Sequence, residues 1–179
     1  MKILVTAASK HDATREMAEW IVEAMWRSGV DAVIVHPDDV TSLDGVDAVV
    51  LGSGVYAGRW LGPATKLVER LKDGLQERPV YLFSSGPLGD PPKPETDPVD
   101  VESIMAATHA VEHRVFPGRL QRKDLGFAER AIVSALRAPE GDFRPRAAVE
   151  AWAQEIVESA RSREVHGAPP VRAEEPALH

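Results

Sequence analysis

Short apolar runs alternate along this sequence with longer segments whose apolar residues recur every three or four positions. The apolar runs occupy residues 3–5, 31–36, 47–53 and 79–84, and a fifth strand segment of mixed polarity occupies residues 112–116. The run at 47–53 is apolar without alternation, which is typical of a strand that is covered on both faces. The runs therefore predict five strands of a parallel sheet.

The segments between the apolar runs have the 3.6-residue period of amphipathic helices. They predict helices over residues 17–28, 62–75, 98–108 and 145–160. Parallel strands that are joined by right-handed helical crossovers form an open, doubly wound sheet. We therefore expect an α/β fold of this kind, with five parallel strands in the order 2-1-3-4-5.

An insertion separates the fifth predicted strand from the last predicted helix. It has a helical pattern of its own, carried by Leu125, Ala128, Ala131, Ile132 and Leu136. Beyond residue 162 the sequence is rich in proline and offers few apolar side chains to bury. We expect one domain over residues 1–162, which includes a helical insertion at 118–144, and a disordered tail over 163–179.

Composition limits the classes of function that this chain can have. The 179 residues include no cysteine, which excludes disulfides, thiolate chemistry and cysteine-ligated metal centres. The histidines have no spacing that defines a metal site, so we predict none. A net charge of −7 argues against a nucleic-acid partner. Without a signal-peptide pattern or a run of about 18 apolar residues, we expect a cytoplasmic location.

Three loops rich in small residues follow predicted strands and should converge on one crevice at the carboxyl edge of the sheet. The first, at residues 9–14, offers the hydroxyls of Ser9 and Thr14, the ammonium of Lys10 and the free N–H groups of a helix N-terminus. Such a helix end suits a phosphate. The same residues also fit a simple helix cap made by Asp12 or Thr14.

The second and third loops are less specific when each is taken alone. The second, at residues 53–60, places Tyr56 and Trp60 beside glycines that let a flat ring approach the backbone. The same aromatic side chains would also serve to pack the loop. The third, at residues 84–89, offers backbone amides and a rigid Gly86-Pro87 turn, and by itself indicates only a turn.

Taken together, the three loops resemble those of the flavodoxin family. The resemblance is nearest to the flavodoxin-domain branch that includes menaquinone-dependent protoporphyrinogen dehydrogenase, and it extends over residues 1–160. It implies FMN as cofactor, with the first loop at the phosphate and the other two beside the isoalloxazine ring. The cofactor-binding residues that it implies are Ser9, Lys10, His11, Asp12, Ala13, Thr14, Ser53, Gly54, Val55, Tyr56, Ala57, Gly58, Ser85, Gly86, Pro87, Leu88 and Gly89.

The sequence departs from the family pattern at Asp12, where the phosphate loop usually has glycine. A carboxylate that points at a phosphate would repel it, and aspartate accepts a positive φ less readily than glycine. Lys10 could offset this charge, or Asp12 could turn outward as a cap. The resemblance implies an FMN-dependent oxidoreductase that passes electrons from a porphyrinogen-like substrate to a quinone. The alternatives are an electron carrier with a protein partner and a flavin-free binding module.

The insertion carries more basic than acidic residues. Its basic side chains up to the start of the last helix are Arg119, Arg122, Lys123, Arg130, Arg137, Arg144 and Arg146, against Asp124, Glu129, Glu140 and Asp142. This excess could dock anionic lipid headgroups or the carboxylates of a porphyrin. The alternative is a solvated helix that covers the crevice edge. We expect a peripheral contact of residues 119–146 with the inner membrane face, and a homodimer is a further expected partner state.

Overall fold

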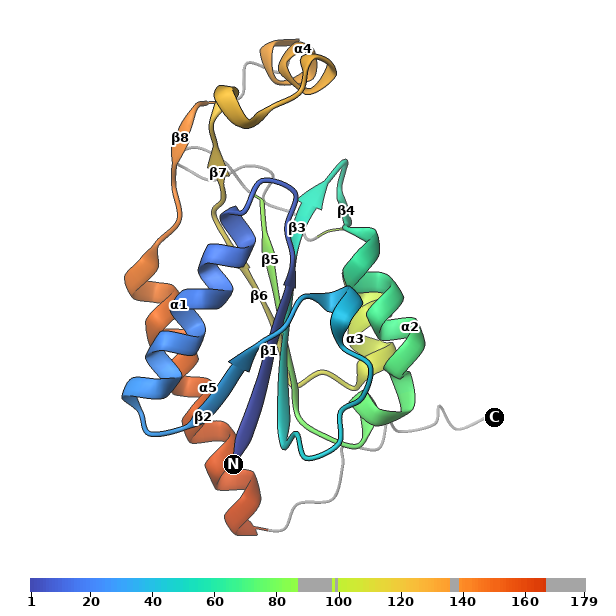
Figure 1. The fold of residues 1–179 in the computed structure, drawn as a ribbon, viewed down its shortest axis with the longest axis vertical. Helices are drawn as coiled ribbons and strands as arrows, with labels where there is room; N and C mark the ends of the chain where they lie inside the picture. Colours follow the sequence, from blue (N-terminus) through green and yellow to red (C-terminus); the bar gives the residue numbers. More distant parts are fainter. Residues whose placement is uncertain (87–97, 99, 136–138, 167–179) are drawn as a thin grey trace, which may run out of the picture.

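Five strands pair in parallel at the centre of the molecule, in a computed structural model that describes residues 1–86, 98, 100–135 and 139–166. They are β1 (Lys2–Ala8), β2 (Asp31–Ile34), β3 (Ala48–Tyr56), β5 (Val80–Ser85) and β6 (Glu112–Phe116). Their order is β2-β1-β3-β5-β6 (Figure 1), which confirms the predicted order 2-1-3-4-5 of the parallel strands.

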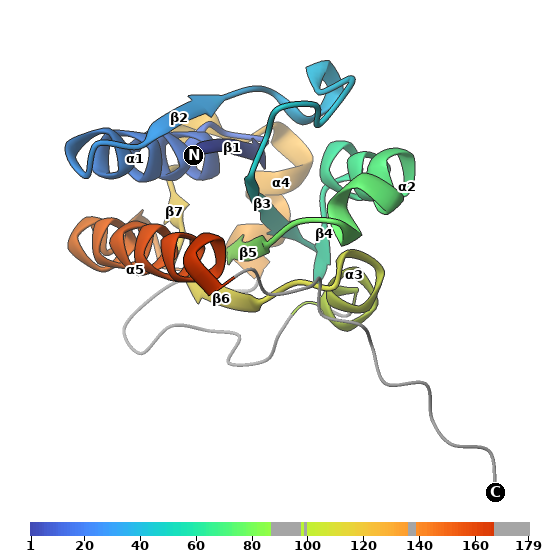
Figure 2. The ribbon, with the colours of Figure 1, turned by 90° about the horizontal axis from the view of Figure 1, so that it is seen from below.

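Helices cover both faces of this sheet. On one face lie α1 (Ala13–Arg27) and α5 (Arg146–His166), and on the other lie α2 (Gly62–Gln76) and α3 (Val101–Thr108) (Figure 2). Successive residues of β1 belong to opposite cores, because Ile3 and Val5 pack with α1 and α5 whereas Leu4 packs with α2 and α3. Burial on both faces explains why the run at 47–53, which forms most of β3, is apolar without alternation.

The second predicted loop is a β-hairpin. The strand β3 continues to Tyr56 and then turns back into a short antiparallel strand, β4 (Arg59–Trp60), which pairs with the end of β3. The two turn residues, Ala57 and Gly58, have φ values of 50° and 73°. A two-residue turn with both φ values positive matches the right-handed twist of the strands. The sequence indicated only a loop at this position, because Ala-Gly is a weaker turn signal than Asn-Gly.

The insertion is only partly helical. Two short strands, β7 (Arg119–Leu120) and β8 (Gly141–Asp142), pair as an antiparallel ribbon. Between them lie a 3₁₀ turn, η2 (Arg122–Asp124), and the helix α4 (Phe127–Ala135). Figure 1 shows the ribbon carrying α4 beyond the carboxyl ends of the strands. The predicted helix is present up to Ala135, and Leu136 of its pattern lies outside the described residues. The ribbon was missed because two-residue strands have no periodic pattern.

The remaining boundaries differ from the sequence expectations by a few residues. The strand β2 ends at Ile34, since a 3₁₀ turn, η1 (Pro37–Asp39), follows it. The helix α5 continues to His166, so the expected domain boundary at 162 falls inside a helix. Residues 167–179 lie outside the described part of the chain. Among the described helices, none is both long and apolar enough to cross a membrane.

Gly52 marks a close approach between β3 and the aromatic core. A Cβ atom at this position would lie 2.2 Å from the ring of Phe83, which is itself packed edge-on against Trp152. We predict that Gly52→Ala lowers the free energy of unfolding by about 2–3 kcal/mol, since a fully buried ring cannot move aside without disturbing its neighbours. Urea unfolding followed by tryptophan fluorescence measures this loss.

Gly62→Ala is the matched control. Gly62 is the first residue of α2, and apart from its two chain neighbours a Cβ atom there would meet no heavy atom within 4 Å. Alanine reduces the freedom of the unfolded chain but is disfavoured in a helical conformation before Pro63, so this change should alter stability by less than about 1 kcal/mol. Equal losses for both variants would show that the ring of Phe83 is not the cause.

Candidate functional site

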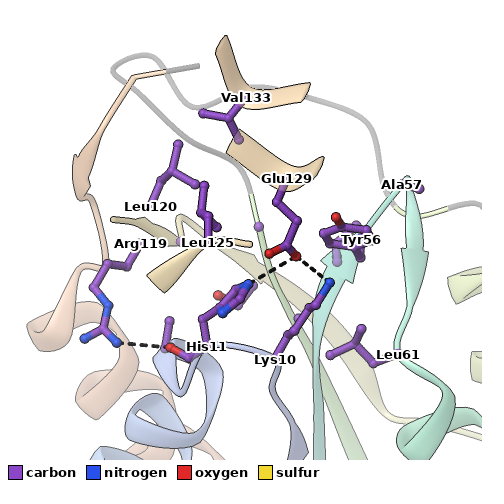
Figure 3. Close-up of a pocket in the computed structure, with 16 residues that line it drawn as sticks. Lys10, His11, Tyr56, Ala57, Leu61, Arg119, Leu120, Leu125, Glu129 and Val133 are labelled. Atoms are coloured by element: carbon purple, nitrogen blue, oxygen red, sulfur yellow. Dashed lines mark hydrogen bonds and ion pairs between the residues drawn. The ribbon is translucent and has the colours of Figure 1, made fainter. Parts of the chain in front are cut away.

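A pocket of about 340 Å³ lies between α4 and the carboxyl ends of β1, β3 and β5 (Figure 3), within the volume range of ligand sites. Its lining residues from the three predicted loops are Lys10, His11, Ala13, Gly54, Val55, Tyr56, Ala57, Ser85 and Gly86. The remaining lining residues are Leu61, Gly118, Arg119, Leu120, Leu125, Glu129 and Val133. The three loops therefore meet in one crevice, as the topology predicts, and the insertion forms its outer wall.

Some residues of the predicted binding set do not line this pocket. They are Ser9, Asp12, Thr14, Ser53 and Gly58. Ser9 and Ser53 instead organise the backbone around the pocket. Pro87, Leu88 and Gly89 lie outside the described residues, so their part in the site stays a prediction.

The first loop adopts the conformation that a glycine usually provides. Asp12 has φ 59° and ψ −12°, in the left-handed region. Its carboxylate accepts a hydrogen bond from Arg15 Nε at 3.1 Å and is 66% exposed, so it points away from the pocket. The predicted side-chain cap by Asp12 is absent, and the backbone N–H of Thr14 donates to Ser9 Oγ at 3.3 Å instead. The electrostatic objection to Asp12 is thereby removed, while its conformational cost remains.

The two aromatic residues of the second loop have different roles. Trp60 is 5% exposed, and its indole N–H donates to Ser84 Oγ at 2.7 Å, so it packs the hairpin against the sheet. Ser53 Oγ accepts from the backbone N–H of Leu61 at 2.9 Å, which ties the hairpin to the start of α2. Tyr56 is 43% exposed and lines the pocket, with Lys10 Nζ 4.1 Å from its ring centroid. Of the two, Tyr56 is the ring available to a ligand.

Two glycines let the third loop and the insertion meet backbone against backbone. A Cβ atom on Gly86 would lie 3.0 Å from Val55 Cβ, and one on Gly118 would lie 3.4 Å from Gly86 Cα. Larger residues here would push the third loop away from the hairpin, or the insertion away from the third loop. The close approach of these segments shapes the inner wall of the pocket.

Glu129 is the main site residue that sequence reasoning missed. From α4 it reaches across the pocket, where its Oε1 forms an ion pair with Lys10 and lies 3.3 Å from His11 Nε2. Its Oε2 accepts from the backbone N–H of Gly126 at 2.8 Å. The hydrogen bond from Lys10, followed by that from Gly126, lowers the pKa of Glu129 to about 2. A glutamate three residues after a helix N-cap is typical of a capping box, but that pattern does not reveal the contact with Lys10.

The insertion is fixed to the first loop by a cluster of charged groups at its base. The carboxylate of Glu16, on α1, accepts from Arg119 Nη1 at 2.9 Å and from Arg144 Nη1 at 2.7 Å. The guanidinium of Arg144, only 4% exposed, also pairs with Asp142 at 2.7 Å. Arg119 donates to the carbonyl of His11 at 3.2 Å. The base of the insertion and the first loop therefore share one set of ion pairs.

A doubly wound parallel sheet with three carboxyl-end loops around one pocket defines the flavodoxin-like fold class. A sequence profile described as "Flavodoxin domain" matches residues 4–145, and the chain belongs to this family. A comparison with curated proteins found no match to this chain. The narrower likeness to the protoporphyrinogen dehydrogenase branch therefore stays a prediction.

Solved structures agree on the fold. A flavodoxin from the domain Archaea is 19% identical, with a TM-score of 0.61 over 90% of this chain and 99% of its own. A variant of the flavodoxin from Pseudomonas aeruginosa is 13% identical, with a TM-score of 0.61 over 90% and 99%. The rubredoxin:oxygen oxidoreductase from Desulfovibrio gigas is 12% identical, with a TM-score of 0.64 over 91% of this chain and 37% of its own. At these identities the likeness supports the fold alone.

The outward position of the Asp12 carboxylate leads to a first prediction for this site. Asp12→Gly should raise the free energy of unfolding by about 0.5 kcal/mol, because glycine adopts a positive φ without strain. It should change FMN affinity by less than about threefold, since a screened, exposed charge acts weakly at a distance. Urea unfolding and FMN titration measure the two effects. His109→Gly, at a φ of 51° in the C-cap of α3, is the control for the backbone effect.

A second prediction concerns Glu16. Burial alone would raise its pKa, but the hydrogen bonds from Arg144 and Arg119 outweigh burial and lower the pKa below the ordinary 4.5. Because the pKa is lowered on folding, the charged carboxylate stabilises the fold above pH 4.5, and this contribution is lost as the pH falls through the folded pKa. Glu16→Gln should therefore cost about 2 kcal/mol at pH 7, and the difference from the wild type should shrink below pH 4.5.

Thermal unfolding of both proteins between pH 7 and pH 3 measures this change. Glu19→Gln is the control, since Glu19 pairs with Arg15 on the exposed side of the same helix and should contribute less than about 0.5 kcal/mol. A difference for Glu16→Gln that stays constant down to pH 3 would contradict a role for its charge.

Proposed function

We propose that this chain is an FMN-binding flavoprotein that transfers electrons between a small substrate and an acceptor such as a quinone. One observation carries the proposal: the three loops that the flavodoxin likeness assigns to FMN line one pocket of ligand size, although they are far apart in the sequence. The family match and the fold likeness to flavodoxins support it.

Most residues of the pocket fit an FMN molecule. The first loop has its left-handed residue and its hydroxyl at the start of α1, and the Asp12 carboxylate points elsewhere. Tyr56 and the apolar side chains of Leu61, Leu120 and Val133 offer surfaces against which a flat ring can pack. The exception is Glu129, whose negative charge lies among the groups that would meet the phosphate.

Each part of the pocket has a separate task under this proposal. Lys10 and His11 would hold the phosphate, and the backbone N–H groups of Ala13 and Thr14 would have to leave their present acceptors, the carbonyl of His11 and Ser9 Oγ, to join them. Tyr56 would pack against the ring, and the backbone of Ser85 and Gly86 would lie along its edge. Bound flavin would supply the redox chemistry that a chain without cysteine lacks. The protein would contribute binding, orientation and electrostatics.

The cover formed by α4 favours a small substrate over a protein partner. A carrier that exchanges electrons with another protein needs an exposed flavin edge, whereas here Glu129 and Val133 of α4 line the pocket. A porphyrinogen-like donor and a quinone acceptor are the specific pair that the family resemblance favours. This assignment rests on likeness within the family and not on a substrate contact.

A contact with an anionic membrane surface through residues 119–146 stays part of the proposal. Its support is Phe127, which is 93% exposed at the start of α4. Much of the basic charge in this segment is already neutralised within the chain, because several of its arginines pair with carboxylates. These are Arg119, Arg122, Arg144 and Arg146. A homodimer that covers the pocket is a further proposed state.

FMN titration of the purified protein, followed by flavin fluorescence, tests the proposal. We expect FMN to bind at least tenfold more tightly than riboflavin, because riboflavin lacks the phosphate, with FAD as a second comparison. Lys10→Gln should weaken FMN about tenfold, since it removes one charged phosphate contact, and should affect riboflavin far less, through the contact of Lys10 with the Tyr56 ring alone. Lys72→Gln, on the exposed side of α2, is the control.

The same preparation can separate the candidate activities. Oxidation of a porphyrinogen, or reduction of a quinone, by the FMN-loaded protein alone would support an enzyme. Electron exchange with a protein partner only would support a carrier. Absence of FMN binding at concentrations far above micromolar would contradict both and favour a binding module.

A further inference from the structure

The Glu129 carboxylate occupies the cationic corner of the pocket. It contacts two groups of the first loop, Lys10 Nζ and His11 Nε2, and its side chain is 13% exposed (Figure 3). Its pKa of about 2 keeps it negatively charged at neutral pH. An anion is therefore already bound at the place where the pocket offers positive charge.

A phosphate group of a ligand would seek the same two partners. Carboxylate and phosphate oxygens both accept charge-assisted hydrogen bonds from lysine and histidine. The Glu129 carboxylate and a ligand phosphate cannot both contact Lys10 and His11 without repelling each other. We propose that Glu129 is an internal competitor of the ligand phosphate: it occupies Lys10 and His11 in the free protein and swings aside, loosening the first turn of α4, when a phosphate-bearing ligand binds. This inference rests on the proposed function, because that function assigns the phosphate to the first loop.

The attachment of α4 makes such a displacement local. The base of the insertion is held firmly, since Arg144 is buried and pairs with both Glu16 and Asp142. Farther out, Glu129 joins α4 to the sheet domain through its ion pair with Lys10 and its contact with His11 Nε2. Phe127, at the start of α4, is 93% exposed. Loss of the two Glu129 contacts would therefore loosen the first turn of α4, while the base stays in place and Val133 still lines the pocket.

Competition between Glu129 and a ligand phosphate should affect FMN and riboflavin differently. A phosphate-bearing flavin has to displace Glu129, whereas riboflavin does not use Lys10 and His11. Removal of the Glu129 charge should therefore tighten FMN about tenfold without changing the affinity for riboflavin. Glu129→Gln is the suitable variant, because the amide oxygen can still accept from the N–H of Gly126.

Two measurements on the full chain test the proposal, with Glu140→Gln as the matched control. Glu140 lies on the same insertion and pairs with Arg122, but it does not line the pocket. The first measurement compares FMN and riboflavin affinities of the wild type and both variants. The second follows amide hydrogen exchange of α4 without flavin, in chloride and in inorganic phosphate at equal ionic strength.

We expect faster exchange of α4 in Glu129→Gln than in the wild type and Glu140→Gln, together with tighter FMN binding. Inorganic phosphate should speed exchange of α4 in the wild type and have no further effect in Glu129→Gln. Equal exchange in all three proteins would overturn the proposal, and so would faster exchange with FMN affinity unchanged or weaker. If none of them binds FMN, the proposed function fails, and the effect of inorganic phosphate alone decides whether Glu129 competes with anions.

Discussion

The carboxylate of Glu16 is the interaction on which the architecture of the pocket depends. It stands in the first turn of α1, directly after the first loop, and it receives guanidinium groups from both ends of the insertion, Arg119 and Arg144. Charged groups that are partly removed from water are costly unless they are paired. Because these charged groups pair with one another, the first loop and the insertion are held in a fixed position relative to each other.

The sheet could be predicted from the sequence because its information is local and repeated. Strands covered on both faces must be apolar throughout, as in β3, and helices with one buried face carry the stripe seen at Met17 and Ile21. The hairpin and the ribbon could not be predicted in the same way. The strands β4, β7 and β8 contain only two residues each, which is too few to show an alternation of apolar and polar residues.

The location of the site could be predicted from the sequence, whereas most of its side-chain contacts could not. Topology alone brings together Lys10, Tyr56 and Gly86, since parallel strands end at one edge. It does not determine that Asp12 turns toward Arg15, or that Trp60 is buried against Ser84 while Tyr56 is not. The contact between Glu129 and Lys10 joins residues more than a hundred positions apart. Such a contact depends on the path of the insertion, which no local pattern records.

The pairing of β7 with β8 has a consequence for how this fold could vary. Arg119 lies opposite Asp142, so the chain leaves the sheet domain and returns to it side by side. Whatever lies between those two residues can be lengthened, shortened or exchanged without altering the alignment of the central strands. The ribbon is thus a fixed attachment point for the segment above the pocket. Proteins with the same sheet could accept different substrates if this segment differed in size and charge.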